Sequence, residues 1–401
     1  MPLAPTAAKS VFLAINPVSL DVNSDHSLDL LLKELEYVPL ALILVAQLST
    51  GQSCQRMLQL WRKKHTSLLH MQESGVDRMT SVDISISLSL ESISVKKNPE
   101  AVELLSLISM LPDGLLHWEK NLDSVATGFE DADHAATILI KMALVYVNIV
   151  GTLKVLSPIR HHMLDRHPPN KEHILQLEAY YIDMISNHAT VNYGPDLIES
   201  MEILLPENGN ITAVLKSALE DHPSESLAIV GYNMASFLGK VQPSTDLLAI
   251  VQASLDSLNL ANIQTECLQL RGEILYRLCQ WEQSAKEIEE AYNTFTEIGD
   301  QLRAAQCLRS LGDMLCMQSR YTEAQEKLEE ANNRFTQIGD QLGAAQCLQS
   351  LGNILYMQDR YTEAQEKLEV AHSRFTEIGD QLGISQCLES LDQIQVSLNG
   401  L

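Results

Sequence analysis

The C-terminal part of the chain places apolar residues at the spacing of amphipathic helices. In the segment that begins at Gln341, apolar or small residues recur at intervals of three and four, which puts them on one helix face. They are Ala344, Leu348, Leu351, Gly352 and Leu355 in a first helix, and Tyr361, Ala364, Leu368, Ala371 and Phe375 in a second. Gln358-Asp359-Arg360 supplies a polar turn between them, and Gly379 is placed to end the second helix. The pattern predicts a helical hairpin.

This hairpin recurs every 40 residues along 261–401. Ile338-Gly339-Asp340-Gln341-Leu342 returns as Ile378-Gly379-Asp380-Gln381-Leu382, and residues 321–329 return unchanged as 361–369. A fixed period of this size is typical of stacked helical hairpins that share a core and present an extended binding surface. We therefore predict an all-α protein whose C-terminal part, about 170–401, is a right-handed α-solenoid.

The hairpin resembles the tetratricopeptide repeat. Leu351-Gly352 matches the family's Leu-Gly pair, Ala364 and Ala371 match its two small positions, and Leu368 matches the apolar residue between them. Two features depart from the family. The unit exceeds the usual 34 residues or so, which we ascribe to the connection Thr-Glu-Ile-Gly-Asp-Gln-Leu, and the closing proline is absent.

The resemblance implies that outward side chains of the first helices line a ligand groove. The candidates are Gln306, Arg309, Asp313, Gln346, Gln349, Asn353 and Tyr356, preceded by Glu266, Gln269, Glu273 and Tyr276 in the first copy. Amide, tyrosine and charged side chains suit hydrogen bonding to an extended peptide. The two-lysine, two-asparagine clamp of chaperone-binding members is missing, and only Asn353 could play such a part. We predict a protein or peptide partner, with a solvated helix face as the alternative for each residue.

The last copy departs from the pattern. It has Asp392 where the family has glycine, and it reaches Leu401 without a second helix. Solenoid ends need polar surfaces, so the apolar positions near Leu388 and Leu391 predict a chain that stops short of its natural end, a fold-back of the last residues, or self-association. A spacer or self-assembling scaffold is therefore an alternative to ligand binding.

Upstream of the array the pattern is helical but irregular. Residues 1–80 predict a helical subdomain, and 170–260 predict degenerate helical hairpins with Leu175, Leu177, Tyr180, Ile182 and Ile185 in the core. The only strand signal is Leu144-Val145-Tyr146-Val147 and Leu153-Lys154-Val155-Leu156 around Gly151-Thr152, which predicts a β-hairpin. With its flanking helices this hairpin indicates a winged-helix unit over about 82–168, and its uncharged tip argues against DNA binding.

Three motifs precede the array in a fixed order: Tyr37-Val38-Pro39-Leu40-Ala41-Leu42, then Leu104-Leu105-Ser106 through Leu111-Pro112-Asp113-Gly114-Leu115, then Leu156-Ser157-Pro158-Ile159-Arg160. In this order they resemble the region that follows the ATPase core of STAND nucleotide-switch proteins, and the chain is similar to the C-terminal portion of fungal NB-ARC–tetratricopeptide NOD-like proteins. The resemblance implies that Pro39 is a remnant of the contact to the nucleotide's adenine. It also implies that Ser157 replaces the phosphate-sensing histidine of relatives.

ATP hydrolysis in that family needs a Gly-x-x-x-x-Gly-Lys-[Ser/Thr] loop around the phosphates. The only Gly-Lys pair is Gly239-Lys240, which lacks the earlier glycine and is followed by Val241. We therefore expect no enzyme activity and no cofactor, and a chain that begins after the ATPase core, as a partial product or as a regulatory paralogue. The alternative is an ADP/ATP-binding switch protein whose P-loop core is missing from this chain.

The charge and residue composition of the chain exclude several classes of binding partner. The formal net charge of −24 argues against nucleic acid and anionic membranes, and the longest strongly apolar stretch, 38–46, is shorter than the roughly 20 residues of a membrane span. The seven cysteines lack paired spacing, which favours a reducing compartment and hence the cytoplasm. Four of them, at one repeat-equivalent position, are expected in the core: Cys267, Cys307, Cys347 and Cys387. His161-His162 and His167 have no partners at ligand spacing, so we expect no metal.

Overall fold

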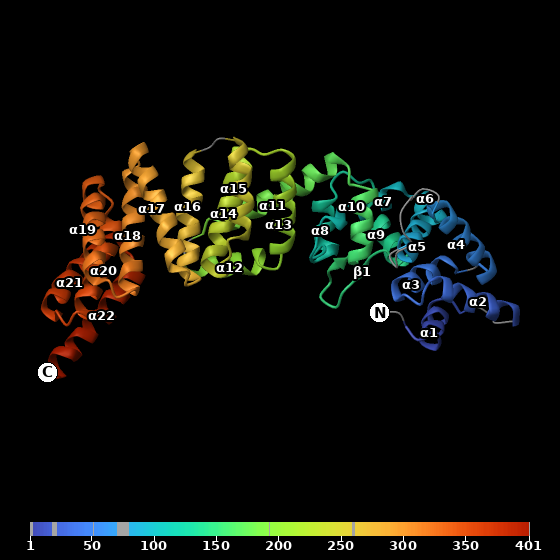
Figure 1. Ribbon diagram of the computed structural model, residues 1–401, viewed down its shortest axis with the longest axis horizontal. Helices are drawn as coiled ribbons and strands as arrows, with labels where there is room; N and C mark the ends of the chain where they lie inside the picture. The colour runs from blue at the N-terminus through green and yellow to red at the C-terminus, as the bar shows by residue number, and fades with distance from the viewer. Residues whose placement is uncertain are drawn as a thin grey trace. The chain divides into compact units, whose positions relative to one another are not determined.

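The computed structural model describes residues 3–17, 22–50, 52–69, 80–191, 193–258 and 261–400. Helices dominate throughout (Figure 1), which confirms the predicted all-α, solenoid-like fold class. The chain divides into two compact units. Unit 1 comprises Met1–His188 with Asn192–Ala218, and unit 2 comprises Ala189–Val191 with Leu219–Leu401.

Unit 1 is built from helices of 4 to 18 residues. They are α1 (Pro5–Ile15), α2 (Val22–Glu34), α3 (Pro39–Leu48), α4 (Cys54–Leu69), α5 (Thr80–Leu90), α6 (Ile93–Lys96), α7 (Pro99–Ser109), α8 (Trp118–Val125), α9 (Ala132–Lys141), α10 (Ser157–Arg166), α11 (Lys171–His188), α12 (Pro195–Leu204) and the first part of α13 (Asn208–Asp221). Proline occupies the first turn of α1, α3, α7, α10 and α12, where its missing N–H would have no helical partner in any case. Helices α1 to α5 enclose one apolar core that contains Phe12, Leu35, Leu42 and Trp61.

The predicted β-hairpin is present in unit 1. Strand β1 (Tyr146–Val147) pairs antiparallel with β2 (Leu153–Lys154), with Tyr146 opposite Lys154. Leu115 forms a further bridge to Leu153, whose N–H and C=O both bond to it. The strands are shorter than the sequence predicted: Leu144 and Val145 are buried but lie outside β1, and Val155 and Leu156 lie outside β2.

A buried polar network fixes α11 and α13 to the turn before this bridge. The Asn210 amide accepts a hydrogen bond from the Asp113 N–H at 2.9 Å and donates to the Gly114 carbonyl at 2.8 Å. It also donates to the Glu207 carboxylate, which accepts a second bond from the Tyr181 hydroxyl at 3.0 Å. Burial raises the pKa of Glu207, although its two hydrogen bonds oppose the shift.

Of the five core residues predicted for α11, only Leu177 and Ile185 are buried, whereas Tyr180 and Ile182 are partly buried and Leu175 is exposed. The helix buries Leu177, Tyr181 and Ile185, which follow one another at four-residue intervals on one face. Leu175 lies off that face and is 55% exposed, and Tyr181 takes the fully buried place that the sequence suggested for Tyr180. The predicted set mixed two faces of the helix, because isolated apolar residues do not define which face meets the core.

Unit 2 consists of α-helices that run alternately up and down. After the last part of α13 they are α14 (Glu225–Val241), α15 (Asp246–Leu258), α16 (Ala261–Arg277), α17 (Trp281–Ile298), α18 (Gln301–Met317), α19 (Tyr321–Ile338), α20 (Gln341–Met357), α21 (Tyr361–Ile378) and α22 (Gln381–Gly400). The pairs α16–α17, α18–α19 and α20–α21 form the predicted hairpins, and each hairpin packs on the next. Helix α22 occupies the place of a first helix in a fourth hairpin.

The structure corrects the reason for the long repeat. Helices α18 and α19 have 17 and 18 residues, and only Gly339 and Asp340 separate α19 from α20. Gly339 has φ +83°, a left-handed conformation that ends α19, and the Asp340 carboxylate accepts the Gly343 N–H at the start of α20. Thr376-Glu377-Ile378 likewise belongs to α21. The extra residues therefore lengthen the helices, and the sequence-based assignment of them to a connection is wrong.

Glycine sets the spacing within each hairpin. A Cβ atom on Gly352 would lie 2.6 Å from Leu368 Cγ, and one on Gly312 would lie 2.6 Å from Leu328 Cγ. These contacts allow the two helices to approach closely, and the facing residues Ala364 and Leu368 are fully buried. The predicted core positions of the repeat are thus confirmed, except that Tyr361 is only partly buried.

Candidate protein-binding face

The predicted groove residues lie together on one side of the array. We call this side the first-helix face, because its side chains come from the first helices α16, α18, α20 and α22. All seven predicted residues are partly buried here: Gln306, Arg309, Asp313, Gln346, Gln349, Asn353 and Tyr356. Their spacing of three and four residues within each helix places them in a continuous row.

Between α18 and α20 this row is held by charged side chains. The Arg309 guanidinium donates a hydrogen bond to Gln346 Oε1, and the Ser350 hydroxyl donates to Asp313 Oδ1 at 2.8 Å. The partners in both pairs lie 37 residues apart in sequence. Neighbouring first helices are therefore offset by three residues from the 40-residue repeat, about one turn.

Between α20 and α22 the same two hydrogen bonds, which we call the ladder, recur with neutral side chains. Gln349 Nε2 donates to Gln386 Oε1 at 3.1 Å, and the Ser390 hydroxyl donates to Asn353 Oδ1 at 3.1 Å, again 37 residues apart. Gln349 thus takes the place of Arg309, and Asn353 takes the place of Asp313. At the end of the row the Tyr356 and Ser397 hydroxyls lie 3.5 Å apart.

The first step of the face, between α16 and α18, is the most charged. Arg303 pairs with Glu266 at 2.7 Å, and Gln269 Nε2 donates to Glu273 Oε1 at 3.1 Å. Two buried polar atoms have no hydrogen-bond partner among the described residues, namely Gln269 Oε1 and Arg309 Nε. Buried polar atoms without partners are uncommon in folded proteins. In this part of the face Arg309 Nε can still donate one hydrogen bond, and Gln269 Oε1 can still accept one.

Burial also perturbs the acids of the face. Desolvation raises the pKa of Asp313, against the opposing effects of the Arg309 guanidinium and the Ser350 hydrogen bond. Desolvation likewise raises the pKa of Glu273, opposed by its bond from Gln269 and by the nearby arginines. For both carboxylates the desolvation by burial outweighs the stabilising effect of these partners.

The sequence located these residues but missed their mutual bonds. The sequence predicts that each side chain meets a ligand or points into solvent, whereas the structure pairs most of them across adjacent repeats. The signal was present in the sequence, because Ser310, Ser350 and Ser390 recur at one repeat position beside Asp313 and Asn353. It was missed because the one-turn offset between neighbouring helices is a property of their packing.

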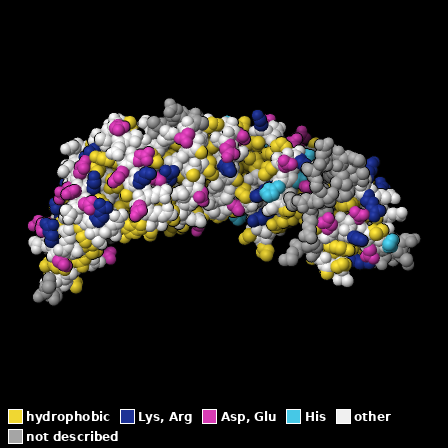
Figure 2. Space-filling view, viewed as in Figure 1, with side chains coloured by type: hydrophobic (Ala, Val, Ile, Leu, Met, Phe, Trp, Pro, Cys, Tyr) yellow, Lys and Arg dark blue, Asp and Glu magenta, His cyan; other side chains and the backbone are white. Residues whose placement is uncertain are grey.

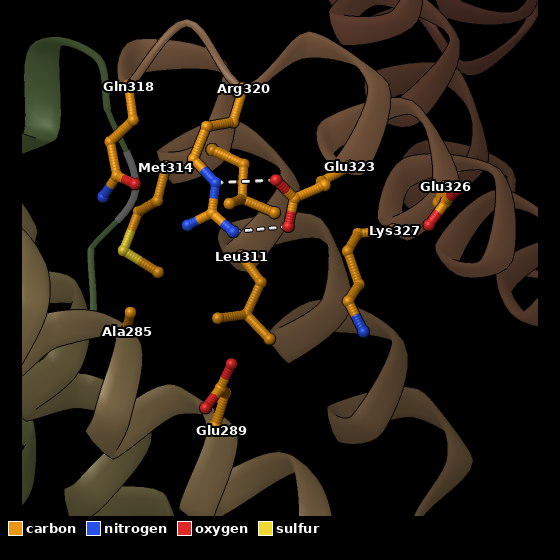
Figure 3. Close-up of a pocket in the computed structure, with 10 residues that line it drawn as sticks. Ala285, Glu289, Leu311, Met314, Gln318, Arg320, Glu323, Glu326 and Lys327 are labelled. Carbon is orange, nitrogen blue, oxygen red and sulfur yellow. Dashed lines mark hydrogen bonds and ion pairs between the residues drawn. The ribbon is translucent and has the colours of Figure 1, made fainter.

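A small cavity lies on the other side of the array, between α17, α18 and α19 (Figure 3). It measures about 150 Å³, and its lining combines apolar and charged side chains: Ala285, Glu289, Leu311, Met314, Arg320 and Lys327. Arg320 is held by Glu323, with Nε 2.8 Å from Oε1. Gln325 takes the place of Ala285 in the next repeat. Its volume is below the range of about 300–1,000 Å³ usual for ligand pockets, and none of the predicted residues lines it.

The residues of the nucleotide-switch resemblance lie outside this face. Pro39 is the first residue of α3 in unit 1 and is partly buried. Ser157 is the exposed first residue of α10. Gly239 and Lys240 lie within α14, where Lys240 Nζ donates to the Val191 carbonyl at 2.9 Å. The only Gly-Lys pair is therefore part of a helix in unit 2 and forms no phosphate-binding loop.

The histidines near α10 serve a structural contact. The buried His162 ring lies with Nδ1 3.0 Å from the Asp83 carboxylate, which links α10 to α5. Burial, together with His162 and Arg166, lowers the pKa of His167. In the part of the chain that the structure describes, no group of three or more His, Cys, Asp or Glu side chains is suited to a metal ion.

The four repeat-equivalent cysteines are core residues, as predicted. Cys267, Cys307, Cys347 and Cys387 have no exposed surface. Desolvation raises the pKa of the first three thiols to about 12 and that of Cys387 to about 11, so they are protonated at neutral pH. Over the described residues, no helix combines the length and apolar character needed to cross a membrane.

Stacked antiparallel helix pairs with a shared core define unit 2 as a helical-repeat array. The stretches 264–337 and 310–377 each match the family model of the tetratricopeptide repeat. Residues 264–377, which span α16 to α21, therefore consist of tetratricopeptide repeats, as the sequence predicted. No curated protein sequence matches the chain.

Comparison with solved structures finds neighbours of low similarity. BtubC (BKLC) from P. vanneervenii is 14% identical with a TM-score of 0.35, over 56% of this chain and 93% of BtubC. A STAND protein with a tetratricopeptide repeat sensor from Pyrococcus horikoshii is 12% identical with a TM-score of 0.34, over 97% of this chain and 62% of that protein. A Rap protein complexed with competence and sporulation factor is 12% identical with a TM-score of 0.34, over 93% and 99%. At these identities and TM-scores the likeness supports no conclusion about this chain.

Proposed function

We propose that the first-helix face binds an extended segment of a partner protein, and that the chain acts as a protein-interaction module without catalytic activity. The observation that supports this proposal most directly is the continuous row of hydrogen-bonding side chains across α16, α18, α20 and α22. Amide, hydroxyl and guanidinium groups can form hydrogen bonds with the N–H and C=O groups of an extended peptide.

The charged part of the row is the proposed centre of recognition. Desolvation raises the pKa of Asp313 and Glu273, and Arg309 Nε has no hydrogen-bond partner among the described residues, whereas the next step shows that neutral side chains form the same ladder. Charges that the ladder does not require are available for a ligand. Hydrogen bonds to charged groups also contribute more to recognition, about 1.5–3 kcal/mol each, than neutral ones.

We further propose that the chain is the sensor and regulatory arm of a cytoplasmic STAND-type signalling protein. The three motifs in unit 1 support this, with Pro39 as a remnant of a nucleotide contact. In this proposal 1–80 is the helical subdomain that follows an ATPase core, 82–168 is a winged-helix unit, 170–260 are degenerate hairpins, and 261–401 is the sensor array. Ligand binding to the array would then shift a conformational equilibrium that another segment reads out.

The test of peptide binding uses a variant copied from the chain itself. A random peptide library is selected on the full chain, and the selected peptides are measured against Arg309→Gln/Asp313→Asn. This variant reproduces Gln349 and Asn353, so it should fold and retain the ladder. We expect selected peptides to bind it about tenfold more weakly, which corresponds to one charge-assisted contact. Glu326→Gln, on the exposed side of α19, serves as the control. If the selected peptides bind the wild type and the Arg309→Gln/Asp313→Asn variant equally, the binding site lies elsewhere.

A second measurement addresses the nucleotide-switch alternative. Isothermal calorimetry of the full chain with ATP and with ADP should give no binding heat at micromolar concentrations, because Pro39 alone supplies no phosphate contact. Micromolar affinity that Pro39→Ala weakens would instead assign nucleotide binding to this chain.

A further inference from the structure

One arginine of the array lacks the partners that its counterpart has one repeat earlier. Arg334 in α19 and Arg374 in α21 hold equivalent positions. Among the described residues Arg374 forms no side-chain hydrogen bond or ion pair, and its Nη1 atom is buried without a partner. Every other arginine in the described part of unit 2 has such a bond. Figure 2 shows basic side chains lying beside acidic ones over the array, so Arg374 is an exception.

The contacts of Arg334 show which groups this position holds when it is occupied. Glu330 lies one turn earlier in the same helix, and its Oε1 accepts bonds from Arg334 Nε at 3.2 Å and from Nη2 at 2.8 Å. Arg334 Nη2 also donates to the Tyr292 hydroxyl at 3.0 Å, and Nη1 donates to Gln301 Oε1 at 3.2 Å. The guanidinium carbon lies 5.5 Å from the centre of the Tyr292 ring. Arg334 therefore has a carboxylate, a hydroxyl, an amide and an aromatic ring around it.

Two sequence differences remove these partners from Arg374. Val370 stands where the preceding repeat has Glu330, and Asn332 stands where it has Tyr292. Val370 is 47% exposed, which leaves the place of the carboxylate accessible from outside. Asn332 Oδ1 is buried and has no hydrogen-bond partner among the described residues. Both differences lie inside the array, because α20 precedes α21 and α22 follows it.

A partly buried guanidinium without an acid favours a carboxylate as its ligand. Arg374 is partly buried, so it loses part of its hydration without gaining bonds in return. A carboxylate can accept two parallel hydrogen bonds from the fork of N–H groups that a guanidinium presents. In the preceding repeat the equivalent arginine is held by such a group, the side chain of Glu330. The chain itself thus indicates the chemical class of the missing partner.

From these observations we propose that Arg374 binds the carboxylate of an aspartate or glutamate side chain that another protein presents beside Val370. The carboxylate takes the place that Glu330 has next to Arg334, and its oxygens accept bonds from Arg374 Nε and Nη2. An apolar group next to the carboxylate covers Val370. The site shares no residue with the row of the first-helix face, so the two surfaces can be tested independently.

Two short peptides test the chemistry directly. Acetyl-Leu-Glu-Leu-amide and acetyl-Leu-Gln-Leu-amide have no terminal charges and differ only in the carboxylate. Each is titrated into the full chain, and the Nε–Hε NMR resonance of Arg374, assigned from its loss in Arg374→Gln, reports binding. We expect the glutamate peptide to bind about tenfold tighter than the glutamine peptide, which corresponds to one charge-assisted contact. Equal binding of the two peptides, or an Arg374 resonance that neither of them shifts, would overturn the proposal.

Reciprocal substitutions copy each repeat into the other. Val370→Glu gives Arg374 a carboxylate of its own one turn away and should weaken binding of the glutamate peptide about tenfold. Glu330→Val removes the acid of Arg334, whose Nε–Hε resonance should then respond to the glutamate peptide. Glu326→Val removes the same charge from an exposed position of α19 and should leave Arg334 unresponsive. Circular dichroism verifies that each variant is folded. Binding at Arg374 that Val370→Glu leaves unchanged would refute the proposed site.

Light scattering on the same samples distinguishes another protein from a second copy of this chain. We expect the chain to be monomeric at the concentrations used for NMR. A dimer that Arg374→Gln dissociates would assign this arginine to self-association and overturn the proposal. Peptides selected for the first-helix face should bind wild type and Arg374→Gln equally, so a failure at one surface is distinguishable from a failure at the other.

Discussion

Helices α20 and α22 hold equivalent positions one repeat apart, yet they meet different surroundings. On the side that faces the preceding hairpin they agree closely, because Cys347 and Cys387 are both fully buried, as are Ile354 and Ile394. On the side that would face a following helix they differ, since Gly352 is buried under Leu368 whereas Asp392 is exposed. The difference shows that each side of a repeat helix is determined by its own neighbour.

Their hydrogen-bond ladders differ in charge and agree in geometry. The ladder that leads into α20 uses Arg309 and Asp313, and the ladder that leads into α22 uses Gln349 and Asn353. Since neutral side chains form the same bonds, the stacking of the repeats does not depend on charge. The charges of the first ladder therefore need an explanation other than architecture, and ligand recognition is the one we propose.

The largest expected effect comes from giving α20 the residue of α22. Gly352→Asp should destabilise the protein by about 4 kcal/mol, because it places a carboxylate without a cation in a closely packed interface. Urea denaturation followed by circular dichroism measures the change in free energy of unfolding. The reciprocal Asp392→Gly serves as the control and should change stability by no more than about 1 kcal/mol, the helix-propensity cost of glycine. Equal effects of the two substitutions would mean that the two faces do not differ in burial.

Removing the serine hydroxyl from each of the two ladders should lower the stability by different, smaller amounts. Ser350→Ala leaves the partly buried Asp313 carboxylate without its hydroxyl donor and should cost about 2 kcal/mol, typical of a bond to a charged group. Ser390→Ala removes the same bond from the neutral Asn353 and should cost about 0.5–1 kcal/mol. Thermal denaturation of both variants provides the comparison. A larger loss for Ser390→Ala would contradict the view that the charged step is the more strongly desolvated one.

Much of this architecture could be predicted from the sequence, and what could not depends on packing. The helices of α18 to α21 follow from apolar spacing, and Gly379 ends α21 as expected, because these features depend on local backbone preferences. The pairing of Arg309 with Gln346 instead of Gln349 could not be predicted, since it depends on how far adjacent helices slide along each other. The prediction that Leu175 lies in the core is wrong for a related reason, because elements distant in sequence decide which face of α11 is covered.

The pH dependence of stability should distinguish Asp313 from Asn353. Because burial raises the pKa of Asp313, its contribution to stability is complete below the ordinary aspartate pKa of about 4 and is lost as pH rises through the raised value. Asp313→Asn should therefore be more stable than wild type by about 1 kcal/mol at neutral pH and equal to it in acid. Asn353→Asp should show the opposite behaviour. Denaturation curves across this pH range measure both, and parallel profiles for variant and wild type would show that Asp313 is solvated.

The smallest effect is expected from Arg309 itself. Arg309→Gln reproduces Gln349, which bonds to Gln386 at 3.1 Å as Arg309 bonds to Gln346, so stability should change by less than about 0.5 kcal/mol. The Arg309 guanidinium does lower the pKa of Asp313 in opposition to burial, so the two substitutions should not be fully additive. A double-mutant cycle with Asp313→Asn measures this coupling by chemical denaturation, and we expect about 0.5 kcal/mol, typical of a pair that water still reaches. A coupling of several kcal/mol would mean that Arg309 already neutralises Asp313 in the free protein, and the charged step would then have no spare charge to offer a ligand.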